Sequence, residues 1–370
     1  SSMKSRVTIG TLTAVVIFFV LLYVVFAKVD NVESVKKNES QKLRVGFVLL
    51  SDTADNGWNE TIYKGIRNAC DSLGVQRNLV IDIPEERIPL ANAVTGMIAD
   101  SLKVIVLTSY NYPILIKDII ESHPEVTFYG INWEYDAPNY KAYFARIYQA
   151  RYLAGIVAGA MTKTNHVGFV AAMKNIQVYR GLNAFILGVQ SVNPRAKVFV
   201  RWTNSWNEGN METENANKLI DSSGIDVIAF HQDRAFIIEV AEKRGLYCIG
   251  NHVENNRFSP RMLTSIAINW GIIYKDFIQD YIQKKDNENM DYWVGLEKDA
   301  VGLAFYSSEV PDSVKILVNA AAEKIKAGYN VFSGRIEDVE GKIRSEEGET
   351  ISDEVLHNEM NWLIKGAIEP

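Results

Sequence analysis

The sequence predicts an α/β protein built from two doubly wound, Rossmann-like lobes that follow an apolar N-terminal segment. Short apolar runs typical of buried strands alternate with segments of helical spacing along most of the 370 residues. These β–α units are too many for one mononucleotide-sized sheet, which favours two lobes. The chain as a whole is 47% hydrophobic and 23% charged, as expected for a protein with a large core.

The N-terminal segment is predicted to anchor the protein in a membrane. Residues 7–27 carry no charged side chain, and Lys4 and Arg6 precede them. About 20 apolar residues cross a bilayer, whereas the apolar core of a cleaved signal has about 7–15. We therefore expect a retained, single-pass signal-anchor in the cell membrane, with residues 1–6 (a tag and cytoplasmic residues) inside and the rest extracytoplasmic. Cleavage after Ala27 is the alternative.

The first predicted lobe begins after a linker at residues 28–42, which is rich in Lys and Glu. Its first helix has apolar residues at helical spacing from Trp58 to Leu73, and Gly74 ends it. A second helix is expected to begin near Pro113. The strands expected in this lobe are "LRVGFVLL" (43–50), "KVIVLTS" (103–109) and "VTFYGI" (126–131).

A long helix over about 148–162 opens the second predicted lobe. The segment 263–270 and the helix after it are expected to return to the first lobe, and 298–305 to cross back. The strands expected in the second lobe are 166–172, 197–202, 226–231 and 247–250. The predicted lobes are residues 43–145 with 268–296, and 146–267 with 297–370. Several crossings between two such lobes form a hinged cleft, the architecture of type I periplasmic binding proteins.

The loops after the predicted strands supply the candidate ligand-binding residues, because ligands of open α/β sheets bind beyond the carboxyl ends of the strands. Aromatic rings recur there beside amides and carboxylates, a combination that suits a planar, hydrogen-bonding ligand. A structural role is the alternative for each residue: Asp55, for example, could cap the helix at Trp58. The candidates are Asp55, Trp58, Asn59, Ser109, Tyr110, Asn175, Trp206, Gln232, Asp233, His252 and Glu254.

Composition and motifs argue against several other functions. The net charge of −6 offers no basic footprint for nucleic acid. Cys70 and Cys248 do not form a CxxC pair, so no zinc site is expected. The nucleotide-cradling GxxxxGK[ST] motif, HExxH and GxSxG are absent from the sequence. We therefore expect neither an enzyme nor a bound cofactor or metal.

Several long blocks make the chain resemble the basic membrane protein (BMP) family, the purine nucleoside receptor-like substrate-binding proteins of ABC transporters. They include "DNGWN", "RYLAGIVAGAMTKTNHVGFVA", "RGLNAFILGVQSVNP", "WTNSWNEG", "DVIAFHQD" and "MLTSIAINWGIIY", and the resemblance covers about residues 43–370. The adenine-associated subgroup is the most similar. The resemblance implies that Trp58, Tyr110 and Trp206 hold a base. Gln232 replaces the threonine of the subgroup's "HTD" segment, and the family's lipid-anchor cysteine is missing.

The expected function is therefore an extracytoplasmic binding protein for adenine or a purine nucleoside. Its implied partners are the permease and ATPase subunits of an ABC importer. The alternative is a membrane-anchored domain that senses the same ligand and signals through a partner or a C-terminal module outside this sequence, a hypothesis favoured by the uncharged run at residues 7–27.

Overall fold

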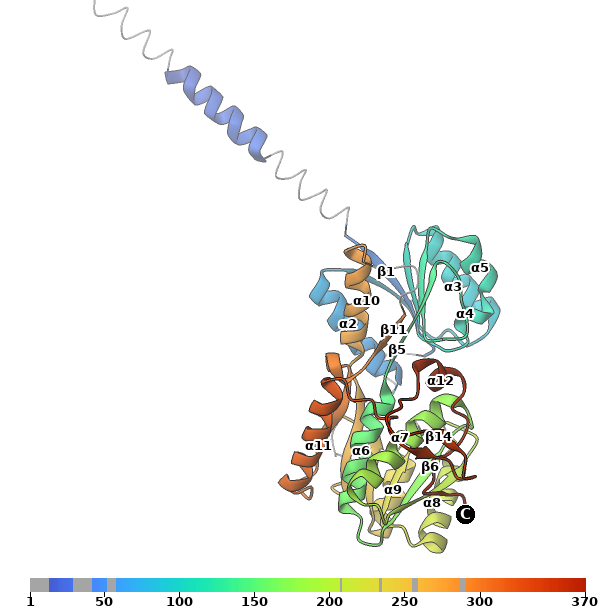
Figure 1. The fold of residues 1–370 in the computed structure, drawn as a ribbon. Helices are drawn as coiled ribbons and strands as arrows, with labels where there is room; N and C mark the ends of the chain where they lie inside the picture. Colours follow the sequence, from blue (N-terminus) through green and yellow to red (C-terminus); the bar gives the residue numbers. More distant parts are fainter. Residues whose placement is uncertain are drawn as a thin grey trace, which may run out of the picture.

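Two α/β lobes lie one above the other in the computed structural model (Figure 1), as the sequence predicts. The structure describes residues 13–28, 42–51, 58–206, 208–232, 235–254, 259–285 and 291–370. Each lobe has one twisted sheet with helices packed against it.

The first lobe contains a six-stranded sheet of order β11-β5-β4-β3-β1-β2, in which every neighbouring pair is parallel. Its strands are β1 (Arg44–Val48), β2 (Gln76–Val80), β3 (Val104–Leu107), β4 (Thr127–Gly130), β5 (Tyr140–Ala145) and β11 (Tyr292–Val294). Its helices are α2 (Trp58–Leu73), α3 (Arg87–Ala99), α4 (Tyr112–Leu115), α5 (Lys117–Ser122) and α10 (Trp270–Ile282). Helix α2 ends where predicted, because Gly74 adopts the left-handed φ of 65° that stops a helix.

The second lobe contains a seven-stranded sheet of order β12-β10-β9-β8-β6-β7-β15. Its strands are β6 (His166–Ala171), β7 (Lys197–Trp202), β8 (Val227–Phe230), β9 (Tyr247–Asn251), β10 (Met262–Ile268), β12 (Val301–Tyr306) and β15 (Ala367–Ile368). Its helices are α6 (Ile147–Met161), α7 (Ile176–Val192), α8 (Gly209–Ser223), α9 (Phe236–Arg244), α11 (Asp312–Lys326) and α12 (Asp353–Asn358). A 3-10 turn η1 (Leu296–Lys298) precedes β12, and a small ribbon, β13 (Ile336–Glu337) with β14 (Ile343–Ser345), precedes α12.

The expectation that segment 263–270 returns to the first lobe is wrong for its strand. Strand β10 pairs with β9 on one side and with β12 on the other, so its backbone hydrogen bonds are satisfied within the second sheet. The crossing comes after β10, and α10 then packs against α2. Strand β12 runs antiparallel to β10, so the second sheet is mixed at this edge. The lobe boundaries given above stay a prediction.

The apolar core holds the helices of each lobe against its sheet. Helix α6 is buried from Tyr148 to Gly159, because it packs between α7 and the second sheet. Phe169 of β6 and Phe185 of α7 meet edge to face with ring centroids 5.1 Å apart. In the first lobe, Phe47 of β1 contacts Tyr274 of α10 in the same way at 5.7 Å. Both lobes therefore hold their strand ends on rigid, buried scaffolds.

The predicted membrane anchor lies only in part within the described residues. Residues 13–28 form a helix, and residues 7–12 fall outside the description. In the part of the chain that the structure describes, no helix has both the length and the apolarity needed to span a bilayer.

Candidate functional site

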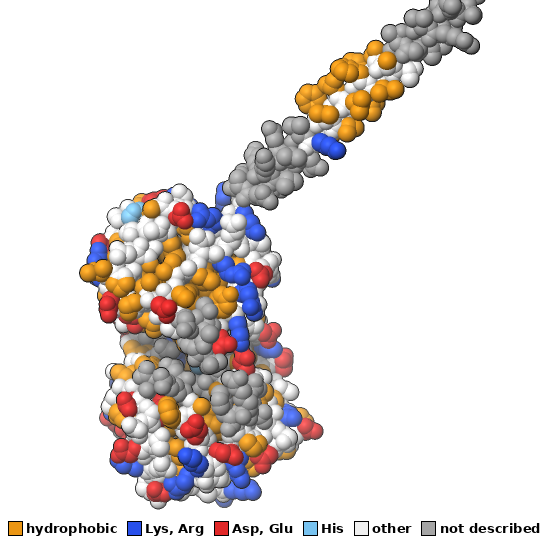
Figure 2. All heavy atoms as spheres, turned by 180° about the vertical axis from the view of Figure 1, so that it is seen from behind, with side chains coloured by type: hydrophobic (Ala, Val, Ile, Leu, Met, Phe, Trp, Pro, Cys, Tyr) orange, Lys and Arg blue, Asp and Glu red, His pale blue; other side chains and the backbone are white. Residues whose placement is uncertain are grey.

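The carboxyl ends of the parallel strands face the boundary between the lobes, and the first lobe presents apolar side chains there. Leu50 follows β1, Ile81 follows β2 and Tyr110 follows β3, and these side chains are 38%, 40% and 43% exposed. Figure 2 shows hydrophobic side chains gathered on the first lobe next to the waist of the molecule. Such a wall suits a ligand with an apolar face.

Residues 109–112 divide into two exposed side chains, Tyr110 and Asn111, and two buried ones. Ser109 is buried, and so is Tyr112, whose hydroxyl donates to the carbonyl oxygen of Ile83 at 2.5 Å. Tyr110 stays half-exposed, and burial together with the adjacent Glu134 raises its pKa. The ring of Tyr110 is therefore the exposed aromatic surface that this segment offers to a ligand.

Two of the predicted aromatic residues meet across the lobes. Trp58 begins α2 in the first lobe, and His252 follows β9 in the second. Their rings lie edge to face with centroids 6.1 Å apart, and Trp58 also contacts Trp270 at 5.3 Å. Burial, followed by the charge of Arg151, lowers the pKa of His252 to about 3, so its imidazole is neutral at pH 7.

A groove of about 430 Å³ runs beside this contact. Helix α2 supplies one side with Thr61, Lys64 and Asn68, and residues 252–254, 267–270 and 301–303 supply the other. Lys64 Nζ forms an ion pair with Glu254 at 3.0 Å, a bond that spans 190 positions in the sequence. Both side chains are largely exposed, so the pair joins the lobes but adds little stability.

Three other predicted residues have partners within the protein. The Oδ1 atom of Asn59 accepts from the backbone N–H of Ser51 at 3.4 Å. Asn175 caps α7 by accepting from the N–H of Val178 at 3.0 Å, which is the structural alternative for this residue. Gln232 is fully buried, and both ends of its amide are hydrogen-bonded inside the second lobe.

The remaining predicted residues are Trp206, Asp55 and Asp233. Trp206 is half-buried and packs against the apolar core of the second lobe. Asp55 and Asp233 lie outside the described residues. Among the described residues, no cluster of His, Cys, Asp and Glu could hold a metal ion.

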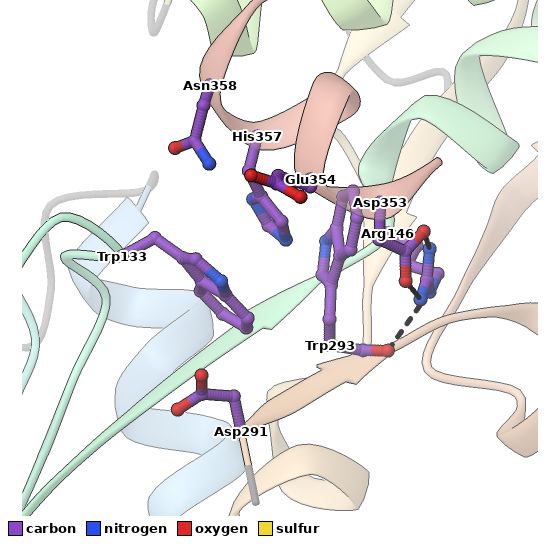
Figure 3. A pocket seen from close by; sticks show the side chains of 8 residues that line it. All are labelled: Trp133, Arg146, Asp291, Trp293, Asp353, Glu354, His357 and Asn358. Atoms are coloured by element: carbon purple, nitrogen blue, oxygen red, sulfur yellow. Dashed lines mark hydrogen bonds and ion pairs between the residues drawn. The ribbon is translucent and has the colours of Figure 1, made fainter. Parts of the chain in front are cut away.

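A second cavity of about 380 Å³ lies where α12 meets the first lobe (Figure 3). The ring of His357 stacks on Trp133, with centroids 4.2 Å apart and planes 13° apart, and lies 3.7 Å from Trp293. Arg146 forms a bidentate ion pair with Asp353 at 3.0 and 2.7 Å, and its guanidinium lies 4.0 Å from the ring centroid of Trp293. The stack of Trp133 on His357 is thus another contact between the lobes.

Sequence reasoning missed Lys64, Arg151 and His357. Arg151 had a signal, because it is a single cation within the apolar helical run "RYLAGIVAGAM". Lys64 and His357 had none, since their partners are distant in the chain and come close only in the folded protein.

Comparison with known proteins identifies relatives of this architecture. Residues 42–331 match the family model described as ABC transporter substrate-binding protein PnrA-like (Bmp). A purine-binding protein of Brucella abortus (strain 2308) is 31% identical over 88% of this chain and 93% of its own length. A putative ABC transporter glucose-binding protein of Haloferax volcanii is 28% identical over 91% of this chain and 83% of its own.

The crystal structure of a transcriptional activator of the comK gene from Bacillus halodurans superposes with a TM-score of 0.69. It is 22% identical in sequence and is matched over 77% of this chain and 98% of its own. At that identity the likeness concerns the fold, which is the two-lobe α/β architecture described above.

Proposed function

The chain belongs to the family of PnrA-like ABC transporter substrate-binding proteins, and we propose that it binds a purine base or purine nucleoside between its lobes. Membership of this family makes it a substrate-binding protein of the ABC transporter type. A small-molecule ligand and permease and ATPase partners follow from that class.

The contact between Trp58 and His252 carries the proposal, because it brings the strand ends of the two lobes to within ring-contact distance. Tyr110 follows β3, which pairs with β1 in the first sheet, so its exposed ring belongs to the same set of strand ends. Stacking of a base on an aromatic side chain contributes roughly 1–3 kcal/mol. The 31% identity to a purine-binding protein over most of both chains supports the same ligand class.

Thermal denaturation with a panel of ligands tests the proposal. A ligand that binds the folded state stabilises it by about 2.7 kcal/mol at a hundredfold excess over its dissociation constant. We expect adenine or adenosine to raise the Tm, and glucose, ribose and amino acids to leave it unchanged. Glucose is the most informative control ligand, because one relative of this chain is a putative glucose-binding protein. If glucose gives the largest shift, the proposed ligand class is wrong.

We also propose that residues 7–27 hold the binding lobes on the outer side of the cytoplasmic membrane. The uncharged run of residues after Lys4 and Arg6 supports this. Mass spectrometry of the protein from its native host should find residues 7–27 still attached. A mature N-terminus at Lys28 would contradict a retained anchor.

A further inference from the structure

Arg151 is a buried cation beneath the strand ends of the second lobe. It lies on α6 and is 2% exposed, and burial lowers its pKa to about 9, which leaves it charged at pH 7. Its guanidinium donates to the carbonyl oxygen of Phe230 at 3.1 Å and to Oδ1 of Asn251 at 2.8 Å. Among the described residues no carboxylate accepts from it, so two neutral acceptors fix its orientation.

Asn251 extends this contact to the end of the neighbouring strand. Its Oδ1 accepts from Arg151, so its Nδ2 must face the other way. That nitrogen donates to the carbonyl oxygens of His231 at 2.8 Å and Gln232 at 3.1 Å. Strand β8 ends at Phe230, so these carbonyl groups lie where the regular ladder stops, and the Asn251 amide takes the place of a strand partner.

The same hydrogen bonds reach a third strand end. Gln232 Nε2 donates to the hydroxyl oxygen of Thr203 at 3.2 Å, and that hydroxyl donates to the carbonyl oxygen of Ser205 at 2.7 Å. Thr203 directly follows β7, and Trp206 is three residues further on. One buried network thus joins α6 to the ends of β9, β8 and β7, where the second-lobe ligand residues are expected.

We propose that Arg151 and Asn251 are positioning residues for the ligand site. They fix the backbone of residues 231–232, and through Gln232 and Thr203 the start of the loop that carries Trp206. They therefore set ligand affinity without contacting the ligand. This inference rests on the proposed function only in that the ligand binds between the lobes. The guanidinium is needed because only a forked donor serves Phe230 and Asn251 together.

The decisive variant is Asn251→Asp. The new carboxylate still accepts from Arg151 and gains an ion pair, but it can no longer donate to the carbonyl oxygens of His231 and Gln232. The matched control is Asn193→Asp, because Asn193 Nδ2 also donates to two acceptors, the Gly159 carbonyl at 3.1 Å and Asn165 Oδ1 at 2.9 Å. Asn193 follows α7 at the opposite, amino-terminal end of the β6 and β7 strands.

Calorimetric titration with adenosine and amide hydrogen exchange of peptides covering 227–232 are the two measurements. Asn251→Asp should lose about tenfold in affinity, the scale of one to two hydrogen bonds, and should exchange faster in 227–232. Asn193→Asp should change neither, whatever its Tm. The affinity of Arg151→Lys should lie between those of wild type and Arg151→Met, because an ammonium group keeps the charge but not the forked pair of donors.

The two failures are distinguishable. If wild type binds no purine, the proposed function fails, and exchange in 227–232 still tests the positioning role. If Asn251→Asp exchanges and binds like wild type, the positioning role is overturned. It is also overturned if affinity in all four variants simply follows Tm, because that is the behaviour of a purely structural network.

Discussion

At the residue scale, burial where the lobes meet changes the pKa of titratable side chains. His357 lies between Trp133 and Trp293, and its Nε2 atom is buried without a partner among the described residues. Burial, followed by the charge of Arg180, lowers its pKa to about 3. The folded protein thus holds this imidazole neutral, whereas the unfolded chain protonates it near pH 6.5.

The stability of the protein should therefore fall as the pH is lowered from 7 to 5. Between about pH 6.5 and 3 the unfolded state binds more protons at His357 than the folded state, so acid favours unfolding. One such group contributes at most about 1.4 kcal/mol per pH unit, and His357 less because its ring is partly solvated. His357→Phe keeps a flat ring between the indoles and should flatten the dependence of Tm on pH.

His123→Gln, which removes a first-lobe histidine outside this stack, is the control and should keep the wild-type slope. The measurement stops at pH 5 to leave out Asp353. Arg146 lowers the pKa of Asp353, so the stability that this carboxylate contributes is lost only below about pH 4. His252, whose pKa is also lowered, leaves part of the slope in His357→Phe. An unchanged slope in His357→Phe would contradict this account.

The rings of Tyr110 and Trp206 should hold the ligand by stacking. Tyr110→Ala and Trp206→Ala should each lose roughly 1–3 kcal/mol of binding free energy, about 5- to 150-fold in affinity. Asp233→Asn exchanges an acceptor for a donor and should cost as much or more, because an unmatched buried donor is expensive. Calorimetry measures all three. Tyr329→Ala, a ring that lies under Lys324, is the control. Unaltered affinity in all three variants would place the site elsewhere.

At the element scale, close packing of α6 on α7 fixes the base of the second lobe. A Cβ atom on Gly155 would collide with the carbonyl group of Phe185, and one on Gly188 with that of Tyr152. At Gly159 it would lie 2.7 Å from the Val189 carbonyl oxygen. These are backbone atoms, which cannot turn aside as a side chain does. The glycines thus let α6 approach closely enough to place Arg151 under the strand ends.

Gly155→Ala should destabilise the protein, because the two helices must separate to admit one methyl group. Overpacking of this kind costs about 1–3 kcal/mol. Gly96→Ala in α3 is the matched control, since a Cβ there meets no atom within 4 Å. It should be neutral or stabilise by up to about 1 kcal/mol, as alanine favours the helix. Urea denaturation of both variants measures the difference, and equal stabilities would contradict the packing argument.

At the scale of the whole molecule, the contacts that join the lobes among the described residues differ in strength. Lys64–Glu254 is an exposed ion pair, and exposed pairs contribute about 0.2–1 kcal/mol and weaken in salt. Trp133 stacked on His357 is half-buried. The Trp133–His357 contact should therefore affect the balance between closed and open lobes more than the Lys64–Glu254 ion pair does.

Trp133→Ala should open the lobes without touching the ligand wall. Its removal lowers the closed population, and the apparent dissociation constant rises in inverse proportion to that population. Small-angle X-ray scattering of the ligand-free protein should show a larger radius of gyration, and titration a weaker affinity. Lys64→Gln should change both quantities much less, and less still in high salt. The prediction fails if Lys64→Gln has the larger effect.

Most of the architecture could be predicted from the sequence because its signals are local. Helix α2 runs from Trp58 to Leu73 as its apolar spacing predicts, and buried runs such as β3 and β8 lie within the predicted segments. The prediction missed β2, β5 and β11 of the first sheet. Strand β5 is fully buried and reads "YKAYFA", in which Lys141 interrupts the apolar residues. The other two lack a local signal. Strand β2 reads "QRNLV" and is only partly buried at the sheet edge, and β11 has three residues. Their place depends on pairing with β1 and β5, not on their own composition.

By itself, the sequence determined the two-lobe fold, the family and the loops where ligand-binding residues are expected. Apolar periodicity and the composition of strand ends are local signals that can be read from neighbouring residues. Only the tertiary structure decided which groups touch. It joined Lys64 to Glu254, Trp133 to His357, and Arg151 to the ends of three strands. It also showed that the Gln232 amide forms its hydrogen bonds inside the second lobe. The partners of a buried amide depend on which groups the packed chain brings close to it, and no local sequence pattern encodes them.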